Sequence, residues 1–521
     1  MNRERHQNLR PADKKPNEKY GLVLGGGGSK GCYHVGVWQA FNEAGITFDA
    51  LSGTSIGALV GIFYPGNRIE TVTDFVMNMQ PQEIAADLPV LPVTLKEKVL
   101  GSRTVLNFII KYFDSKMDIT PLREHFRMMF DYETFKESPV RYGCMAYNDT
   151  KKEARAFFKG EITAENAEEV VMASSACYPA FPKVTINGEE YMDGMYADNV
   201  PIDLLNALDP SLDWTVVVDL HDPGEPLPPS LTEDMFYLEP LINPGNALDF
   251  STCHAMRMYN QGYLETRKQL GSLCGYLYTF ENRDLPLIEI VENYLIRQTM
   301  QMHIVFPKIP DLDFHILKSA LGYTPGRSSA AADPGYEFGR LVEALALLAK
   351  IDPVALYDYG DYLDQIVTQL DAIKSSYDGD EFRIVEFFSK MKREEIMVVL
   401  HRYLKKSGHF PSKVEAIKEQ IPLSYTLAWI WYCLDALVES LHHVRAIHEG
   451  NDELEEELSR TPQTQTEDES SKTENSKDQK TNTDPASLAS PSSEPAVLNA
   501  QDPDAYVRVM SGEKETEPEN V

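Results

Sequence analysis

A serine stands between two glycines in the stretch Gly53-Thr54-Ser55-Ile56-Gly57, directly after a short apolar segment and directly before a helical pattern. This spacing matches G-x-S-x-G, the sharp strand-to-helix turn that exposes a nucleophilic serine at the edge of a sheet. Gly53 and Gly57 suit such a turn because a side chain there would collide with neighbouring backbone. The helix dipole at Ser55 favours negative charge. By itself, the pattern also fits an ordinary tight turn.

A run of glycines precedes this serine by one predicted strand. The run does not fit the Walker A pattern, but Gly26-Gly27-Gly28-Ser29-Lys30-Gly31 satisfies G-x-G-x-x-G, and Asp49 lies at about the distance of a ribose-binding acid. However, Asp49 begins the second strand, whereas that acid should end it. The alternative is an oxyanion hole made of backbone N–H groups at a helix N-terminus. Since carboxyl ends of parallel strands share one edge of a sheet, this loop and Ser55 can converge on one carbonyl carbon, which favours the oxyanion hole.

A serine nucleophile needs a base, which is usually a histidine. No histidine has an accompanying motif, and three of them cluster on the last predicted helix without metal-ligand spacing: His442, His443 and His448. Asp193, followed by Gly194, places a carboxylate on a glycine turn after a predicted hairpin. Asp193 also fits a simple turn cap, so the residues alone leave both roles open.

The elements around these motifs predict a parallel α/β sheet. A strand at residues 20–24, the glycine loop, a helix ending at Gly45, a second strand at 48–52 and the Ser55 turn follow one another in the order of such a sheet. Paired strands are predicted at 140–147 and 154–158, a hairpin around Asn187-Gly188, and a buried strand at 214–220.

Composition narrows the class of protein. The chain has 521 residues, a formal net charge of -31 and 43% hydrophobic residues, so a globular protein with more than one domain is expected and nucleic acid is not expected as a partner. Six scattered cysteines favour a reducing compartment, and the polar N-terminus and the lack of a long apolar run predict a cytoplasmic protein without a signal peptide or membrane span.

Four segments follow from the patterns: a disordered arm at 1–18, an α/β catalytic domain at 19–284, a helical region at 285–450 and a disordered acidic tail at 451–521. Two apolar stretches, at 105–113 and at 427–437, are candidates for a membrane-facing surface or lid. The alternative is that both are faces of helices buried in the core.

Three ordered motifs resemble those of the patatin-like phospholipases: the glycine loop, the Ser55 turn, and Asp193-Gly194 with Asn199 and Pro201. The segment from Ala173-Ser174-Ser175-Ala176 to Phe181-Pro182 resembles the family's small-residue stretch before its aspartate. The resemblance covers about 20–210. It implies a three-layer sandwich with a mainly parallel central sheet.

The resemblance further implies a serine–aspartate dyad, with Ser55 as nucleophile and Asp193 as base. It assigns the oxyanion N–H groups to Gly26, Gly27, Gly28 and Ser29, and it matches Lys30 to the family's basic position. One departure is Met195, where the family usually has Gly or Ala, and this bulkier side chain is expected to narrow the acyl pocket or shift the turn.

The expected function is therefore a serine acyl-ester hydrolase, acting on a lipid or another acyl ester without metal or cofactor, with peripheral membrane contact. Two alternatives remain. One is a non-catalytic lipid-binding or scaffold protein on the same fold, and the other is a dinucleotide-binding protein.

Overall fold

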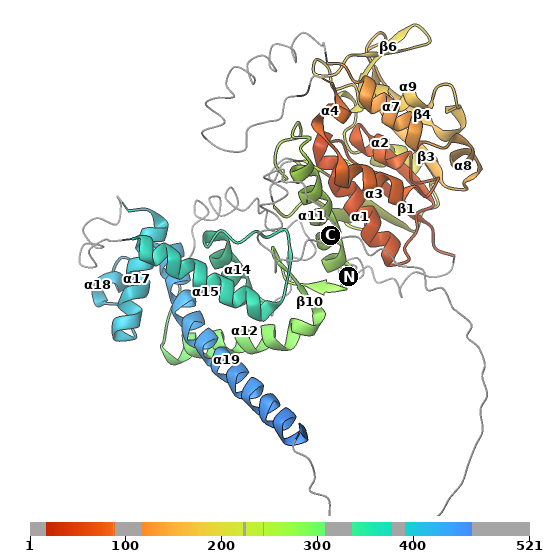
Figure 1. Ribbon diagram of the computed structural model, residues 1–521. Helices are drawn as coiled ribbons and strands as arrows, with labels where there is room; N and C mark the ends of the chain where they lie inside the picture. Colours follow the sequence, from red (N-terminus) through yellow and green to blue (C-terminus); the bar gives the residue numbers. More distant parts are fainter. Residues whose placement is uncertain are drawn as a thin grey trace, which may run out of the picture.

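The computed structural model describes residues 17–86, 88, 117–221, 226–242, 244–307, 336–377 and 391–460. The described chain forms a sheet-containing half and a mainly helical half, which lie side by side (Figure 1).

An eight-stranded sheet forms the centre of the first half, in the order β5-β6-β3-β2-β1-β7-β8, with β4 paired to β3. The five neighbouring strands β3, β2, β1, β7 and β8 are parallel to one another, and β4, β5 and β6 run antiparallel to their neighbours. Their bounds are β1 Tyr20–Leu24, β2 Ala50–Thr54, β3 Arg141–Asn148, β4 Glu153–Phe158, β5 Val184–Ile186, β6 Glu189–Asp193, β7 Trp214–Val218 and β8 Phe236–Leu238. The sheet is therefore mainly parallel, as the sequence predicts.

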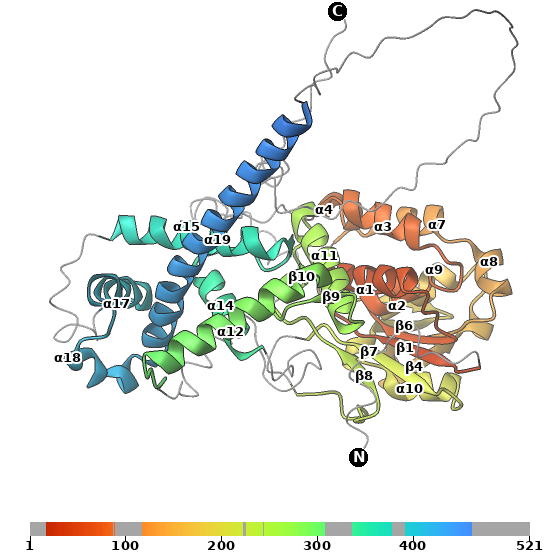
Figure 2. The same cartoon turned by 90° about the horizontal axis from the view of Figure 1, so that it is seen from below.

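Alternating side chains on the strands build a core on each face of this sheet. Leu22 and Leu24 belong to the larger core, and Val23 between them packs in a smaller core with Leu205 of α10 (Ile202–Leu208). Figure 2 shows α10 on one side of the sheet and the other helices on the opposite side. Those helices are α1 Cys32–Glu43, α2 Ile56–Gly61, α3 Ile69–Asn78, α4 Pro81–Ile84, α7 Thr120–Met129, α8 Tyr132–Glu137, α9 Ala167–Ser174 and α11 Thr252–Gln269. Helix, sheet and helix make the three-layer sandwich.

Within the described residues, the second half contains six α-helices, and it also contributes to a small sheet that the sequence patterns did not predict. The helices are α12 Leu285–Gln301, α14 Glu337–Leu348, α15 Tyr359–Ser376, α17 Arg393–Ser407, α18 Ser412–Glu415 and α19 Pro422–Arg460. The strands β9 Leu273–Cys274, β10 Thr279–Glu281 and β11 Leu356–Tyr357 form the sheet β11-β10-β9. Short strands of this kind are hard to detect because two residues carry no periodicity.

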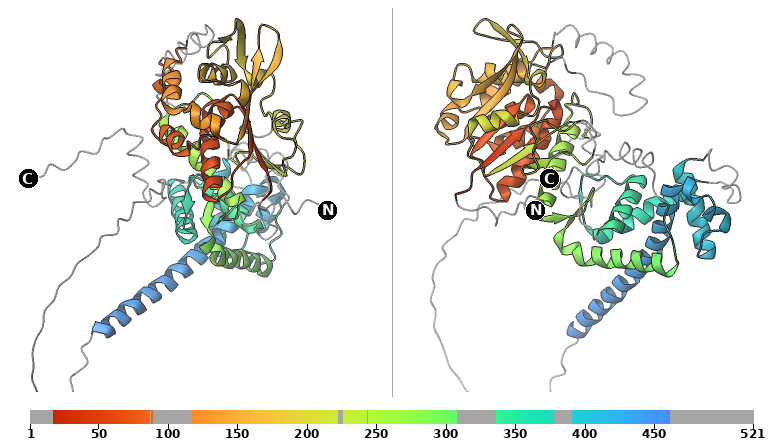
Figure 3. Two further views of the ribbon diagram at one scale, coloured as in Figure 1. Left: turned by 90° about the vertical axis from the view of Figure 1, so that its right-hand side faces the viewer. Right: turned by 180° about the vertical axis from the view of Figure 1, so that it is seen from behind.

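Two sequence-based expectations for this half need correction. Helix α19 continues to Arg460, so the first ten residues of the segment predicted as a disordered tail are helical, and Figure 3 shows this end projecting from the other helices. Glu and Leu are strong helix formers and extend a helix that has already started. Trp429 and Trp431 are fully buried, so the apolar stretch at 427–437 is core and not a membrane-facing surface. The other candidate stretch, 105–113, and the tail beyond 460 lie outside the described residues.

Candidate active site

Ser55 occupies a strained turn between β2 and α2. Its backbone has φ 55° and ψ -124°, an unusual conformation for a residue with a side chain, and strain of this kind concentrates at functional sites. The turn is tight because the backbones touch: a Cβ on Gly57 would lie 2.1 Å from the carbonyl oxygen of Leu24 at the end of β1. Similar overlaps, at 2.5 Å or less from a neighbouring atom, would arise at five other motif glycines: Gly26, Gly28, Gly31, Gly53 and Gly194.

Asp193 ends β6 and faces this serine. Ser55 Oγ donates a 2.6 Å hydrogen bond to Asp193 Oδ2, and the backbone N–H of Met195 donates a 2.9 Å bond to Asp193 Oδ1. Asp193 is 1% exposed and Ser55 is 8% exposed. Burial raises the pKa of the Asp193 carboxyl from 3.8 to about 6, although the hydrogen bonds from Ser55 and Met195 lower it in part. A carboxylate with this pKa is ionised at neutral pH and positioned to accept the serine proton.

The end of α9 and the residues after it hold both side chains in place. Ser174 Oγ accepts a 3.0 Å bond from the Ser55 backbone N–H, and Ser175 Oγ donates a 3.1 Å bond to the Ser55 carbonyl. The backbone N–H of Asp193 donates to the Ala176 carbonyl at 2.9 Å. The sequence marked this small-residue segment only by resemblance, and its positioning role was not predicted because Ser174 and Ser175 lie far from Ser55 along the chain.

Two of the four oxyanion donors expected from the resemblance are already in use. The N–H of Gly26 donates to the Asn199 carbonyl at 3.0 Å, and the N–H of Ser29 donates to the Ala247 carbonyl at 2.8 Å. These two predictions are therefore wrong as donor assignments, because a backbone N–H that is satisfied by a carbonyl is not available to a substrate.

Gly27 and Gly28 keep their N–H groups available: within the part of the chain that the structure describes, neither group has an acceptor. Gly28 has φ +60°, and a Cβ there would lie 2.3 Å from the Ala247 carbonyl oxygen, so only glycine fits. Lys30 is buried in the same loop, where its Nζ donates to the Leu220 carbonyl at 3.3 Å. The loop thus presents two adjacent donors beside a buried cation.

The histidines near the site have other partners. His34 Nε2 lies 2.8 Å from the carbonyl oxygen of Gly25, and burial lowers the pKa of His34 to about 4, so it is neutral and supports the glycine loop. His221 borders the same pocket as Ser55, but its Nδ1 lies 2.8 Å from Asp219 and its Nε2 lies 3.3 Å from Glu239. Neither ring is placed as the base of Ser55.

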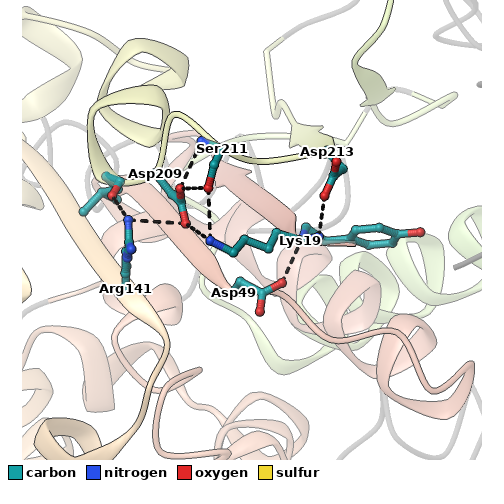
Figure 4. Close-up of polar contacts among 8 residues, drawn as sticks. Lys19, Asp49, Arg141, Asp209, Ser211 and Asp213 are labelled. Atoms are coloured by element: carbon teal, nitrogen blue, oxygen red, sulfur yellow. Dashed lines mark hydrogen bonds and ion pairs between the residues drawn. The ribbon is translucent and has the colours of Figure 1, made fainter. Parts of the chain in front are cut away.

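Asp49 lies at the opposite edge of the sheet from the glycine loop. Its Oδ2 accepts a 2.9 Å bond from the Tyr20 N–H at the amino end of β1. Figure 4 shows it in a polar cluster in which Lys19 and Arg141 contact Asp209, at 3.4 Å and 3.3 Å. Asp49 therefore stabilises the amino end of β1 through this hydrogen bond. Its position does not fit a ribose-binding acid, which lies at the carboxyl ends of the strands.

Two neighbouring cavities lie at this site, and the dyad borders one of them. The wider one has a volume of about 410 Å³ and is bordered by Ser55, Asp193 and Met195. A second cavity of about 70 Å³ lies among α2, α3 and α7 and is lined mainly by aliphatic and aromatic side chains. The two share Ile56 and Leu59 in their walls. The Met195 side chain thus borders the cavity at Ser55, and its backbone N–H still donates to Asp193.

In the segments that the structure describes, no cluster of three or more His, Cys, Asp or Glu side chains is arranged to hold a metal ion. None of the helices in those segments is both long enough and apolar enough to cross a bilayer.

The fold and the site define an α/β protein with a serine turn that is hydrogen bonded to an aspartate and flanked by a glycine loop. Residues 22–206 match the family model of patatin-like phospholipases. This part of the chain is a patatin-like phospholipase domain, in agreement with the resemblance of the three motifs.

Curated relatives include two fungal lysophospholipases. The one from Aspergillus niger is 25% identical over 309 residues, which is 49% of this chain and 18% of the relative. The one from Meyerozyma guilliermondii is 29% identical over 204 residues, which is 38% of this chain and 12% of the relative. The match therefore spans less than a fifth of these relatives. Among solved structures, VipD from Legionella pneumophila is 15% identical with a TM-score of 0.32, covering 81% of this chain and 92% of VipD.

Proposed function

We propose that this protein is a serine hydrolase of lipid acyl esters, with Ser55 as nucleophile and Asp193 as general base. The observation that carries the proposal is the 2.6 Å hydrogen bond from Ser55 Oγ to the buried Asp193 carboxylate, beside the N–H groups of Gly27 and Gly28, which have no acceptor among the described residues. A lipid ester is favoured because an apolar cavity neighbours the cavity that Ser55 borders, and because the relatives are named lysophospholipases.

The reaction follows from these positions. Asp193 accepts the Ser55 proton while Oγ bonds to the ester carbonyl carbon, and the resulting oxyanion lies against the N–H groups of Gly27 and Gly28. When the ester C–O bond breaks, the proton on Asp193 passes to the leaving alcohol. Asp193 then takes a proton from water, which attacks the acyl-enzyme, and Ser55 regains its proton as the fatty acid leaves. This scheme requires no metal or cofactor.

The test compares hydrolysis of a panel of phospholipids and lysophospholipids by the unmodified chain and by Ser55→Ala. We expect Ser55→Ala to lose at least about a thousandfold in rate, because the nucleophile is gone and only binding and the oxyanion donors remain. Asp193→Asn is expected to lose nearly as much. The matched control is Asp198→Asn, in the same segment, which is expected to retain activity.

A fluorophosphonate probe separates this proposal from a scaffold on the same fold. Covalent labelling at Ser55 that disappears in Ser55→Ala supports an enzyme, whereas a folded chain without labelling favours the scaffold. We also propose a cytoplasmic location, which agrees with six cysteines that are all free thiols.

A further inference from the structure

Three large side chains are exposed around the mouth of the catalytic cavity: Tyr178 at 39%, Met195 at 49% and Tyr196 at 47%. They are called the rim below. Met195 borders the cavity directly, and Tyr178 lies beside Cys177, which also borders it. The Tyr196 hydroxyl donates a 2.6 Å bond to the Tyr178 carbonyl, so the two loops that carry the rim are joined.

This grouping differs from scattered surface hydrophobics. Single exposed apolar side chains are common, but a cluster at the entrance of a site marks an interaction surface. Tyrosine has an apolar ring and a polar hydroxyl, and it is enriched where hydrocarbon meets water. The rim also lies at a cavity that shares wall residues with the apolar cavity among α2, α3 and α7.

The charges beside the rim are balanced. Lys183 Nζ lies 5.2 Å from the centre of the Tyr178 ring and pairs with Asp149 at 2.6 Å and Glu190 at 3.0 Å. Two further lysines are paired in the same region, Lys151 with Glu189 at 2.6 Å and Lys152 with Asp149. Three lysines and three acids leave no local excess of positive charge, and the whole chain carries -31. An anionic surface is therefore disfavoured.

We propose that Tyr178, Met195 and Tyr196 form a docking surface for a zwitterionic phospholipid surface, which brings the mouth of the catalytic cavity to the lipid–water interface. That docking serves lipid hydrolysis rests on the proposed function, but the binding of the rim to a lipid surface does not require catalysis. The surface differs from both apolar stretches that the sequence suggested, and one of those, 427–437, is buried core.

The first test measures co-sedimentation of full-length Ser55→Ala with phosphatidylcholine vesicles. Adding Tyr178→Ser and Tyr196→Ser is expected to lower the vesicle-bound fraction at least about fivefold. The matched control adds Ile290→Ser and Met300→Ser, which remove two exposed apolar side chains from α12 in the other half of the molecule (Figure 1), and it is expected to bind like Ser55→Ala alone. Equal loss in both variants, no binding before substitution, or tighter binding to phosphatidylserine vesicles overturns the proposal.

The second test places a reporter on the rim and does not depend on removing side chains. Tyr178→Trp in the Ser55→Ala chain is expected to add an emission that brominated phosphatidylcholine quenches, while unquenched emission overturns the proposal. In the active chain, Tyr178→Ser with Tyr196→Ser is expected to retain turnover of a soluble short-chain ester and to lose turnover of vesicle lipid. If no ester is hydrolysed but the vesicles still bind through the rim, the proposed function fails and the docking surface stands.

Discussion

The most consequential single residue is Asp193, since its pKa of about 6 connects burial to chemistry. The same burial that makes its negative charge costly also makes the carboxylate a stronger base than a solvated aspartate. Ser55 and the Met195 N–H supply two hydrogen bonds to the charged form, so the carboxyl remains ionised near neutral pH.

This pKa predicts an acid limit to activity. Below about pH 6, Asp193 is protonated and cannot accept the Ser55 proton, so kcat/KM should fall about tenfold for each further pH unit. The measurement is the pH profile of kcat/KM with a soluble ester. A flat profile down to pH 4 would contradict the role of Asp193 as base.

The buried charge also predicts a cost in stability. The pKa is raised from 3.8 to about 6, and each unit corresponds to about 1.36 kcal/mol, so the ionised carboxylate destabilises the native state by about 3 kcal/mol above pH 6. Asp193→Asn should therefore raise the free energy of unfolding by up to about 3 kcal/mol at pH 8.

Below pH 3.8 the carboxyl is protonated in both the folded and the unfolded chain, so the gain from Asp193→Asn should vanish there. Urea denaturation of both chains at the two pH values checks this difference. An equal gain at both pH values would assign the effect to something other than the charge.

At the scale of elements, we propose that the cavity among α2, α3 and α7, which neighbours the cavity at Ser55, receives part of the acyl chain. Val76 on α3 lines this apolar cavity but does not line the cavity that contains Ser55. The position is therefore suited to change chain-length preference without touching the dyad.

Val76→Phe should fill part of this space and shift the preference toward short esters. We expect the ratio of palmitate-ester to butyrate-ester turnover to fall roughly tenfold, because a few displaced methylene groups are worth 1–3 kcal/mol each at most. Butyrate-ester turnover serves as the internal control and should stay unchanged. A parallel loss for both esters would indicate damage to the fold instead of a shorter cavity.

At the scale of the whole molecule, a buried polar network connects the two halves. Glu265 on α11 accepts bonds from the Tyr33 hydroxyl and the Leu241 N–H, and Glu343 on α14 accepts bonds from the N–H groups at 276–278. Lys268 on α11 donates to the carbonyls of Tyr276 and Tyr278. The hydrophobic core of the helical half also includes Leu241 and Ile242, which precede the predicted boundary at 284. We propose that the two halves fold as one unit.

The network predicts that Lys268 stabilises the molecule in a pH-dependent manner. Burial raises the pKa of Glu265 and Glu343 to about 7, and the Lys268 charge lowers both in part. At pH 8, Lys268→Met leaves two buried carboxylates without their cation and should cost about 3 kcal/mol or more. At pH 5 both carboxyls are neutral, so the cost should be smaller. Thermal unfolding at the two pH values measures this, and a larger cost at pH 5 would contradict it.

The sequence alone determined the order of the first strands and helices, the mainly parallel sheet, and the placement of Ser55 and the glycine loop at one edge of it, whereas Asp193 was assigned only through the family resemblance. These features are encoded locally, because strand alternation, glycine turns and motif spacing are properties of neighbouring residues. The tertiary structure decided which loop N–H groups remain available, since the acceptors of Gly26 and Ser29 come from Asn199 and Ala247, far along the chain.

Tertiary packing also decided whether the apolar stretch at 427–437 is buried or exposed. Trp429 and Trp431 look the same in sequence whether they face lipid or core, and only the helices around them bury them. Conversely, Tyr178 and Tyr196 belong to no sequence motif that predicts their exposure. The folding of two loops around one cavity brings them to its mouth beside Met195. The local sequence pattern determines which helix or strand a residue joins. The contacts between distant elements determine whether its side chain is buried in the core or exposed at the surface.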